Sequence, residues 1–406
     1  MWLIYIFILQ LTKRSILIVL MLSLISTGCS NQQLIREKYP FWGETISLDS
    51  TKLNAPVHMQ LLQPISTDST QACLLIVHGM NEYIGRYGTI AKAFADDYIV
   101  AGIDLAGHGL SNPVLRSAHQ SIESGGIAYD VSDAYLTQAD LRNLQPMREN
   151  FNQALKFLAN QCDKISTKPL PIFILSHSLG SLVTASSLLQ LKNDPLYARI
   201  KGVIFTGPAF SVTRVPGWRG WFQNPLVKFS FHTHQHFLTP HDEPLPIMFF
   251  NQLLALISVP LQDGLIELLS LPGLRNLFSP TTPAWVEDYL HDWEDEKIRH
   301  RADNYIIRRS ILRYVLGVEK EIIQFRQHMQ QFEIPYLLIY SENDPITPAW
   351  GNIDFSEATL HHHKDSKLLP LQGKSHHEQL FSEPKLRGEI LDKIQQWIKN
   401  RIENSL

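Results

Sequence analysis

Hydrophobic residues along this chain gather into short continuous runs that alternate with helix-like stretches. A run of about five apolar residues flanked by turn residues is typical of a strand covered on both faces. Such runs occupy residues 73–77, 98–103, 171–175, 200–205, 335–340 and 367–371. Apolar residues at helical spacing predict helices between them, including 90–95, 147–159, 319–332 and 390–402. This alternation indicates βαβ units and a mostly parallel sheet.

Three other stretches depart from this rhythm. Residues 42–48 and 57–62 alternate in polarity and predict two strands of a hairpin ahead of the first buried strand. Residues 112–142 show little periodicity, so we expect a surface excursion. Residues 210–297 form a large insertion rich in Trp, Phe, Leu and Pro. Its large apolar side chains are expected either to line a channel or to pack the insertion's own core: Trp218, Trp221, Phe222, Phe231, Phe249, Phe250, Leu253, Leu254 and Trp285.

Composition limits the class of protein. The 406 residues are 44% hydrophobic and 18% charged, which suits a globular chain with a sizeable core. The length allows two average domains or one large α/β domain with an insertion. A formal net charge of −3 argues against nucleic acid as a partner, because nucleic-acid binders carry strongly basic surfaces.

The N-terminus carries the parts of an export signal. Two apolar arms flank Lys13 and Arg14, and small residues precede Cys29. The run Gly28-Cys29-Ser30 resembles a bacterial lipobox, which implies cleavage before Cys29 and acylation of that residue. Ser26 replaces the usual Leu of that motif, and an uncleaved anchor or a later start codon remains open. We expect a signal peptide over 1–28, a polar tether over 29–40 and a lipid anchor at Cys29.

Two further cysteines, Cys73 and Cys162, begin a predicted strand and end a predicted helix. Export makes a disulfide between them possible. The sequence is equally compatible with a disulfide and with two free buried thiols.

The pentapeptide Ser176-His177-Ser178-Leu179-Gly180 lies between a predicted strand and a predicted helix. In that context a small-x-Ser-x-Gly sequence forms a nucleophile elbow, a tight turn that presents the Ser hydroxyl. Ser176 takes the place of the usual Gly, and it satisfies the requirement for a small side chain.

Four separated segments follow predicted strands in a fixed order: 78–87, beginning His78-Gly79-Met80; 104–111; the pentapeptide; and Asn343-Asp344-Pro345-Ile346 with the late His pair. Together they resemble the α/β-hydrolase superfamily, and within it the monoacylglycerol lipase and bacterial lysophospholipase branch. The resemblance covers roughly residues 40–402, apart from 112–142 and most of the insertion. It implies a mostly parallel eight-stranded sheet flanked by helices, with a helical cap inserted after the sixth strand.

The chemistry of acyl transfer assigns roles to these residues. Ser178 is the expected nucleophile, and it needs a His base that is oriented by a carboxylate. Asp344 is the expected acid, with Glu342 as the alternative. His377 is the expected base because the run from His377 to Phe381 resembles the lysophospholipase pattern, whereas Gly-x-x-His spacing would favour His376.

An oxyanion hole is the remaining requirement, and its donors are expected to be the backbone N–H groups of Met80 and Leu179. His78, Asp104 and His108 are expected to brace loops. His232, His234 and His236, with His241 and Asp242 nearby, could suggest a metal, but alternating His in such a segment is more often structural. We expect neither a metal nor a cofactor.

The predicted organisation is therefore a signal peptide (1–28), a tether (29–40), a first part of the core (41–209), a cap (210–297) and a second part of the core (298–406). We expect a membrane-anchored lipoprotein of the bacterial envelope that hydrolyses the ester of a monoacyl lipid through an acyl-enzyme. No obligate protein partner is evident. One alternative is a proline-iminopeptidase-type aminopeptidase, which would bind a substrate amine through acidic cap residues: Glu287, Asp288, Asp292, Glu294 or Asp295. A catalytically silent lipid-binding lipoprotein is the other.

Overall fold

The computed structural model describes residues 41–49, 56–65, 70–123, 136, 138–166, 168–239, 243–279, 282, 286–362 and 367–403. All of them belong to the compact unit Lys38–Leu406. The predictions for 1–28, Cys29 and 29–40 lie outside the described residues, as do His241, Asp242 and Trp285.

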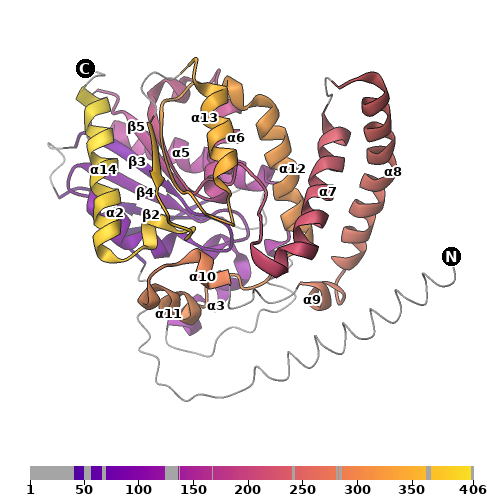
Figure 1. The fold of residues 1–406 in the computed structure, drawn as a ribbon. Helices are drawn as coiled ribbons and strands as arrows, with labels where there is room; N and C mark the ends of the chain where they lie inside the picture. Colours follow the sequence, from indigo (N-terminus) through magenta and orange to yellow (C-terminus); the bar gives the residue numbers. More distant parts are fainter. Residues whose placement is uncertain are drawn as a thin grey trace. The chain divides into compact units, whose positions relative to one another are not determined.

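Eight strands form one sheet in the order β1-β2-β4-β3-β5-β6-β7-β8 (Figure 1). Each pair of neighbouring strands from β4 to β8 in this order is parallel. Strand β2 pairs antiparallel with both β1 and β4. This arrangement confirms the predicted eight-stranded, mostly parallel sheet. The strands are β1 (Glu44–Leu48), β2 (Val57–Leu62), β3 (Ala72–Val77), β4 (Tyr98–Ile103), β5 (Ile172–His177), β6 (Ile200–Thr206), β7 (Tyr336–Ser341) and β8 (Lys367–Leu371).

The central strands are apolar throughout because both faces of the sheet are covered. In β3, Cys73 and Leu75 belong to the core that includes helix α5, whereas Leu74 and Ile76 belong to the core that includes α2 and α14. Side chains alternate across a strand, so a continuous apolar run supplies both cores. The helices outside the cap are α2 (Gly88–Phe94), α3 (Pro113–Glu123), α5 (Gln145–Ile165), α6 (Leu179–Gln190), α12 (Leu312–His328), α13 (Ala349–Thr359) and α14 (Pro384–Glu403).

Two open points are resolved in this core. Cys73 on β3 and Cys162 on α5 form a disulfide, and both are fully buried. The expectation of a surface excursion over 112–142 is wrong for its described part. Residues 113–123 form α3, and Leu115, Leu136 and Ala139 are buried in the core. In α3, Val114, Leu115, Ala118 and Ile122 recur at helical spacing, a short periodic run that the prediction overlooked.

The described residues of the insertion between β6 and α12, which we call the cap, contain five α-helices. They are α7 (Gly220–Leu238), α8 (Leu245–Leu269), α9 (Arg275–Phe278), α10 (Glu287–Leu290) and α11 (Glu294–Ala302). Helices α7 and α8 form an antiparallel hairpin, and α7 lies between α8 and α12 (Figure 1). Most of the aromatic residues expected to face inward are exposed instead, with Trp221 at 79% and Phe249 at 69%.

Candidate active site

The turn between β5 and α6 holds Ser178 in an unusual backbone conformation. Its φ is 49° and its ψ is −120°, a region that residues with a side chain rarely adopt. Such strain costs on the order of 1–3 kcal/mol and persists only where surrounding contacts fix it. The Ser178 N–H donates to the Thr206 carbonyl oxygen at 2.9 Å, and the Ser178 carbonyl accepts from the N–H groups of Ser181 and Ala209.

Gly180 explains why the turn can be so tight. A Cβ atom at this position would lie 2.3 Å from the carbonyl oxygen of His78, so only glycine lets the start of α6 approach the loop after β3. The Ser176 side chain is 1% exposed, and its hydroxyl lies 3.4 Å from the Ile204 carbonyl oxygen on β6. The departure from Gly at position 176 is therefore accommodated by a small side chain.

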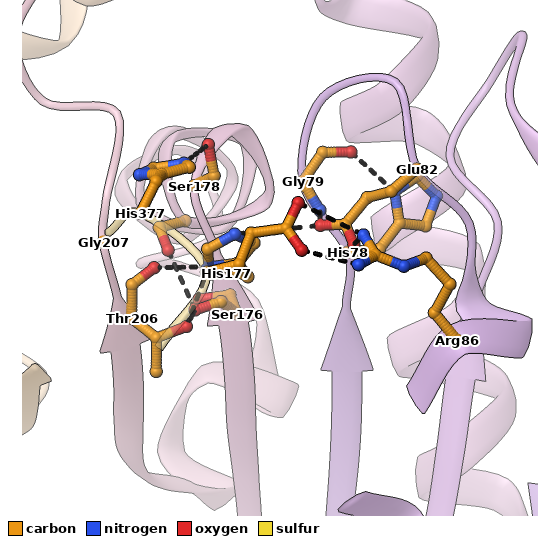
Figure 2. Close-up of polar contacts among 12 residues, drawn as sticks. His78, Gly79, Glu82, Arg86, Ser176, His177, Ser178, Thr206, Gly207 and His377 are labelled. Carbon is orange, nitrogen blue, oxygen red and sulfur yellow. Dashed lines mark hydrogen bonds and ion pairs between the residues drawn. The ribbon is translucent and has the colours of Figure 1, made fainter. Parts of the chain in front are cut away.

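Three predicted residues meet at the carboxyl end of the sheet. His377 Nε2 lies 2.8 Å from Ser178 Oγ, and His377 Nδ1 lies 2.7 Å from Asp344 Oδ2 (Figure 2 shows the Ser178–His377 contact). Because a carboxylate only accepts hydrogen bonds, the proton belongs on Nδ1, and Nε2 is left to accept the Ser178 hydroxyl proton. All three side chains are at most 6% exposed. This is the geometry that general-base activation of a serine requires.

The loop after β7 orients the Asp344 carboxylate. Its Oδ1 accepts from the N–H groups of Ile346 and Thr347, and its Oδ2 accepts from the Thr347 hydroxyl at 2.9 Å. The Thr347 hydroxyl also lies 3.2 Å from His377 Nδ1. Sequence analysis did not identify Thr347. Its position three residues after an acid at a strand end is the signal that could have suggested it.

The two alternative residues lie in other environments. His376 Nε2 is 2.8 Å from the Ser382 hydroxyl, and its Nδ1 is 3.5 Å from Asp292. Glu342 is exposed and accepts from the Gly373 N–H. The structure therefore brings His377 and Asp344 to Ser178, and it brings neither His376 nor Glu342 there.

Charge around His377 favours its protonated form. Burial lowers the pKa of this imidazole, but the neighbouring carboxylates of Asp344, Glu378 and Glu82 raise it, and the net result is a pKa above the ordinary 6.5. A raised pKa makes the imidazole a stronger base for the Ser178 proton.

The loop after β3 passes directly beside Ser178. A Cβ on Gly79 would lie 2.9 Å from the Ser178 Cβ, so the backbone of Gly79, which precedes Met80, lies beside Ser178. Leu179 is the first residue of α6, and its N–H has no partner within the helix. The two expected oxyanion donors thus belong to backbone segments that both border Ser178.

Several residues fix that loop. His78 Nε2 accepts from the Leu105 N–H at 2.9 Å, so its Nδ1–H donates to the Gly79 carbonyl at 2.7 Å. Asp104 accepts from the N–H groups of Ile84 and Leu110. His108 Nδ1 lies 3.0 Å from the Ala106 carbonyl. His78, Asp104 and His108 each brace a loop in the structure.

Arg86 is the centre of a buried ion-pair network that sequence analysis missed. Its guanidinium donates to Glu82 at 2.7 Å, to Glu296 at 3.1 Å and to both carboxylate oxygens of Glu378 at 2.5 and 3.2 Å. Glu82 in turn accepts from the Gly79 N–H at 2.5 Å, as Figure 2 shows. Two features of the sequence could have indicated this network: the four-residue spacing of Glu82 and Arg86, and the position of Glu378 next to His377.

This network joins the loop after β3, the cap and the loop that carries His377. Glu82 lies on the loop after β3, Glu296 on α11, and Glu378 next to His377. Backbone bonds add to it, because the N–H groups of His377 and Glu378 donate to the carbonyls of Tyr289 and Leu290 at 2.7 and 2.9 Å.

One group of side chains in the described residues is close enough to hold a metal ion. The ligand atoms of His291, His300 and Glu378 lie within 4.8 Å of one another. Glu378 already forms a bidentate pair with Arg86, so a metal would have to share that carboxylate. The His-rich part of α7 is occupied differently: His234 contacts Asp263 and Glu319, and His236 contacts Glu243.

A cavity of about 760 Å³ opens on the far side of Asp344. Its lining includes the aromatic side chains of Trp221, Tyr289 and Trp350 and the exposed Arg214. The cap and the loop after β7 both contribute to its wall, so a ligand there would contact the cap and the acid-bearing loop together.

Comparisons with known proteins agree with this geometry. The model of a protein family described as serine aminopeptidase, S33, matches residues 68–384. The phospholipase YtpA of Bacillus subtilis is 28% identical over 146 residues, which cover 36% of this chain and 43% of YtpA. The chain spans less than half the length of the curated relatives it matches.

Solved structures share the architecture. A soluble variant of monoglyceride lipase from Saccharomyces cerevisiae superposes with a TM-score of 0.59 at 13% identity, covering 88% of this chain and 95% of that one. A monoacylglycerol lipase from Paleococcus ferrophilus gives 0.53 at 16% identity, covering 85% and 99%. At these identities the likeness shows the α/β-hydrolase fold, which confirms the fold that was predicted.

Proposed function

The chain belongs to the serine aminopeptidase S33 family of α/β-hydrolases, and we propose that within this family it is a serine esterase acting on monoacyl lipids. The observation that carries the proposal is the hydrogen-bonded series Ser178–His377–Asp344, with Ser178 in a strained turn. A lipid-binding protein without catalytic activity would not require a strained Ser178 or its hydrogen bond to His377.

The proposed reaction follows from the geometry. Ser178 Oγ attacks the ester carbonyl while His377 Nε2 takes its proton. The N–H groups of Met80 and Leu179 stabilise the tetrahedral oxyanion. His377 then gives the proton to the departing alcohol oxygen, which leaves an acyl-Ser178 ester. Water, deprotonated by His377, hydrolyses that ester and returns Ser178 to its hydroxyl form.

The substrate class is supported by the surroundings of Asp344. The aromatic walls of the cavity beside Asp344 suit a ligand with an apolar part, and Arg214 offers a cation for an anionic group, although neither Ser178 nor His377 is among its lining residues. The names of similar proteins point the same way, since two are monoacylglycerol lipases and one is a phospholipase.

The aminopeptidase alternative, which the family description also names, needs a free carboxylate in the cap to hold an amine. Four of the five candidate carboxylates are in ion pairs. Glu287 contacts Arg301, Asp288 and Glu294 contact Lys297, and Asp292 contacts Lys374. This pairing favours the ester over the amine-bearing peptide.

We further propose that the protein is an envelope lipoprotein anchored through Cys29. The buried disulfide between Cys73 and Cys162 supports export, because disulfides persist in oxidising compartments and are rare in reducing ones. Globomycin treatment, or a Cys29→Ala change, should leave a larger unprocessed precursor. An unchanged size would refute the anchor.

A substrate panel tests the enzymatic proposal. The full-length protein and its Ser178→Ala variant are incubated with lysophosphatidylcholine, a monoacylglycerol and a prolyl anilide, and a fluorophosphonate probe reports the reactive serine. We expect ester hydrolysis and probe labelling by the wild type, and neither by the variant. Ser181→Ala, which removes a nearby hydroxyl bonded to the Ser176 carbonyl, is the control that should still be labelled. Preferred cleavage of the anilide would establish the aminopeptidase instead, and an unlabelled, inert protein would favour the binding role.

A further inference from the structure

Helix α8 exposes an apolar surface along its whole length. Among its described residues that are exposed, Gln252 alone has a polar side chain. Phe250, Leu256 and Leu261 are 64%, 63% and 69% exposed. A surface helix of a soluble protein normally turns its polar face outward, and apolar patches of this extent mark interaction sites. We call the exposed residues of α8 its outer face.

The two charged side chains of α8, Asp263 and Glu267, lie at the border of this face and form ion pairs with the rest of the protein. Asp263 contacts Lys320 of α12 at 2.8 Å and His234 of α7 at 3.2 Å. Glu267 contacts Arg142 and Arg313, each at 3.0 Å. Both charges of α8 are therefore paired, and the Glu267 side chain remains 42% exposed at the border of the outer face.

We propose that the outer face of α8 inserts into the surface of a phospholipid bilayer and seats the cap on the membrane. The helix has 25 residues and is long and apolar enough to cross a membrane. Its contacts exclude that orientation, because crossing would carry the paired charges of Asp263 and Glu267 and the packed helix α7 into the acyl region. A helix with one apolar face and one polar, protein-bound face lies in the plane of the interface.

The occupant is lipid rather than a second copy of the chain for three reasons. Protein interfaces form about one hydrogen bond per 100–200 Å², and the outer face offers Gln252 alone for this purpose. On α7, Trp221 and the cation Lys228 are exposed, and these residue types favour the head-group region, where anionic lipids attract cations. The anchor proposed at Cys29 would also keep the core near a bilayer, because the chain from Cys29 to Phe41 spans at most about 40 Å. Only this third reason rests on the proposed lipidation.

The test measures the depth of a label on the hairpin in the full-length chain. A bimane fluorophore is attached at Phe250→Cys in a Cys29→Ser background, where the other two cysteines form the disulfide. The protein is reconstituted in phosphatidylcholine–phosphatidylglycerol vesicles that contain doxyl-labelled lipids. Flotation recovers the vesicle-bound protein for the measurement, and protein that does not bind the vesicles would count against the proposal. The control label is at Glu389→Cys, an exposed position on α14.

We expect acyl-chain doxyl groups to quench the label at position 250 strongly and the label at position 389 weakly or not at all. Adding Leu256→Gln, Leu261→Gln and Leu265→Gln should abolish the quenching at 250 while an unchanged circular dichroism spectrum reports an intact fold. Equal, weak quenching at both positions would overturn the proposal. A dimer that shields the label from lipid would also overturn it, in favour of a second copy. The readout does not depend on hydrolysis, so it can fail or succeed independently of the proposed enzymatic function.

Discussion

Replacing Arg86 with Met tests whether the buried network supports the fold and the site. The side chain of Arg86 is fully buried and bonds to the carboxylates of Glu82, Glu296 and Glu378. Met has a similar volume but no charge, so the change leaves three carboxylates without their common cation. Removing one partner of a buried ion pair costs about 3–5 kcal/mol, because the remaining charge is buried and unpaired. For a unit of the size of Lys38–Leu406 this corresponds to a fall in Tm of roughly 4–7 °C.

The loss should depend on pH in a defined direction. Burial already raises the pKa of Glu82 to about 7, and losing Arg86 raises it further. An acid whose folded-state pKa lies above its unfolded value destabilises the fold above the unfolded pKa, and this penalty disappears as the pH falls towards that value. The Glu82 contribution to the difference between variant and wild type should therefore grow as the pH rises through about 7, by up to about 1.4 kcal/mol per pH unit, and should vanish at lower pH, where Glu82 is protonated in both proteins.

Urea unfolding of the two full-length proteins across this pH range measures the effect. The matched control is Arg142→Met, because the Arg142 side chain is 68% exposed and pairs with Glu267 at the surface. Such a pair contributes about 0–1 kcal/mol, with little pH dependence in this range. If Arg86→Met loses no more stability than the control, or loses the same amount at every pH, the reasoning about the network is wrong.

Three further measurements test the site and the core. His377→Ala should lower kcat/KM on a lysophospholipid by about 10⁴-fold or more, whereas His376→Ala should cost less than about tenfold; comparable losses would contradict the assignment of the base. Because His377 must be neutral to accept the proton and its pKa is raised, kcat/KM should rise with pH through an apparent pKa above 6.5. Asp344→Asn removes a carboxylate that raises this pKa, so the rise should move to lower pH in any residual activity, and an unmoved profile would speak against their pairing. Reducing the disulfide between Cys73 and Cys162, 89 residues apart, should lower the free energy of unfolding by about 4–5 kcal/mol; urea unfolding with and without reductant measures this, and unchanged curves would exclude a stabilising bridge.

The sheet and the order of the candidate site residues were predictable because they depend on local pattern and on topology. Continuous apolar runs identify the buried strands, and parallel strands end at one edge of a sheet. Residues that follow separate strands, such as Ser178, Asp344 and His377, therefore converge without any detailed knowledge of packing.

Other features depend on contacts that periodicity does not encode. Both His376 and His377 follow the last strand, and which of them faces Ser178 depends on the path of the loop and on its bonds to Tyr289 and Leu290. The partners of Arg86 come from three distant parts of the chain. The aromatic residues of the cap were expected inside because apolar side chains are usually buried within the protein. Their exposure departs from that rule unless another apolar phase covers them.

The two ends of the cap are held by opposite kinds of chemistry. At one end, α10 and α11 are joined to the catalytic loop by buried ion pairs and by backbone bonds to His377 and Glu378, where low dielectric strengthens each bond and any displacement leaves a charge unpaired. At the other end, the α7–α8 hairpin holds its charges against α12 and leaves an apolar face outside. The first end fixes the position of His377. The second end can be covered by fluid lipid, which requires no specific pairing of side chains. With α8 seated on a membrane as proposed, the cap would contact lipid at this second end while α10 and α11 hold the loop of His377 at the first.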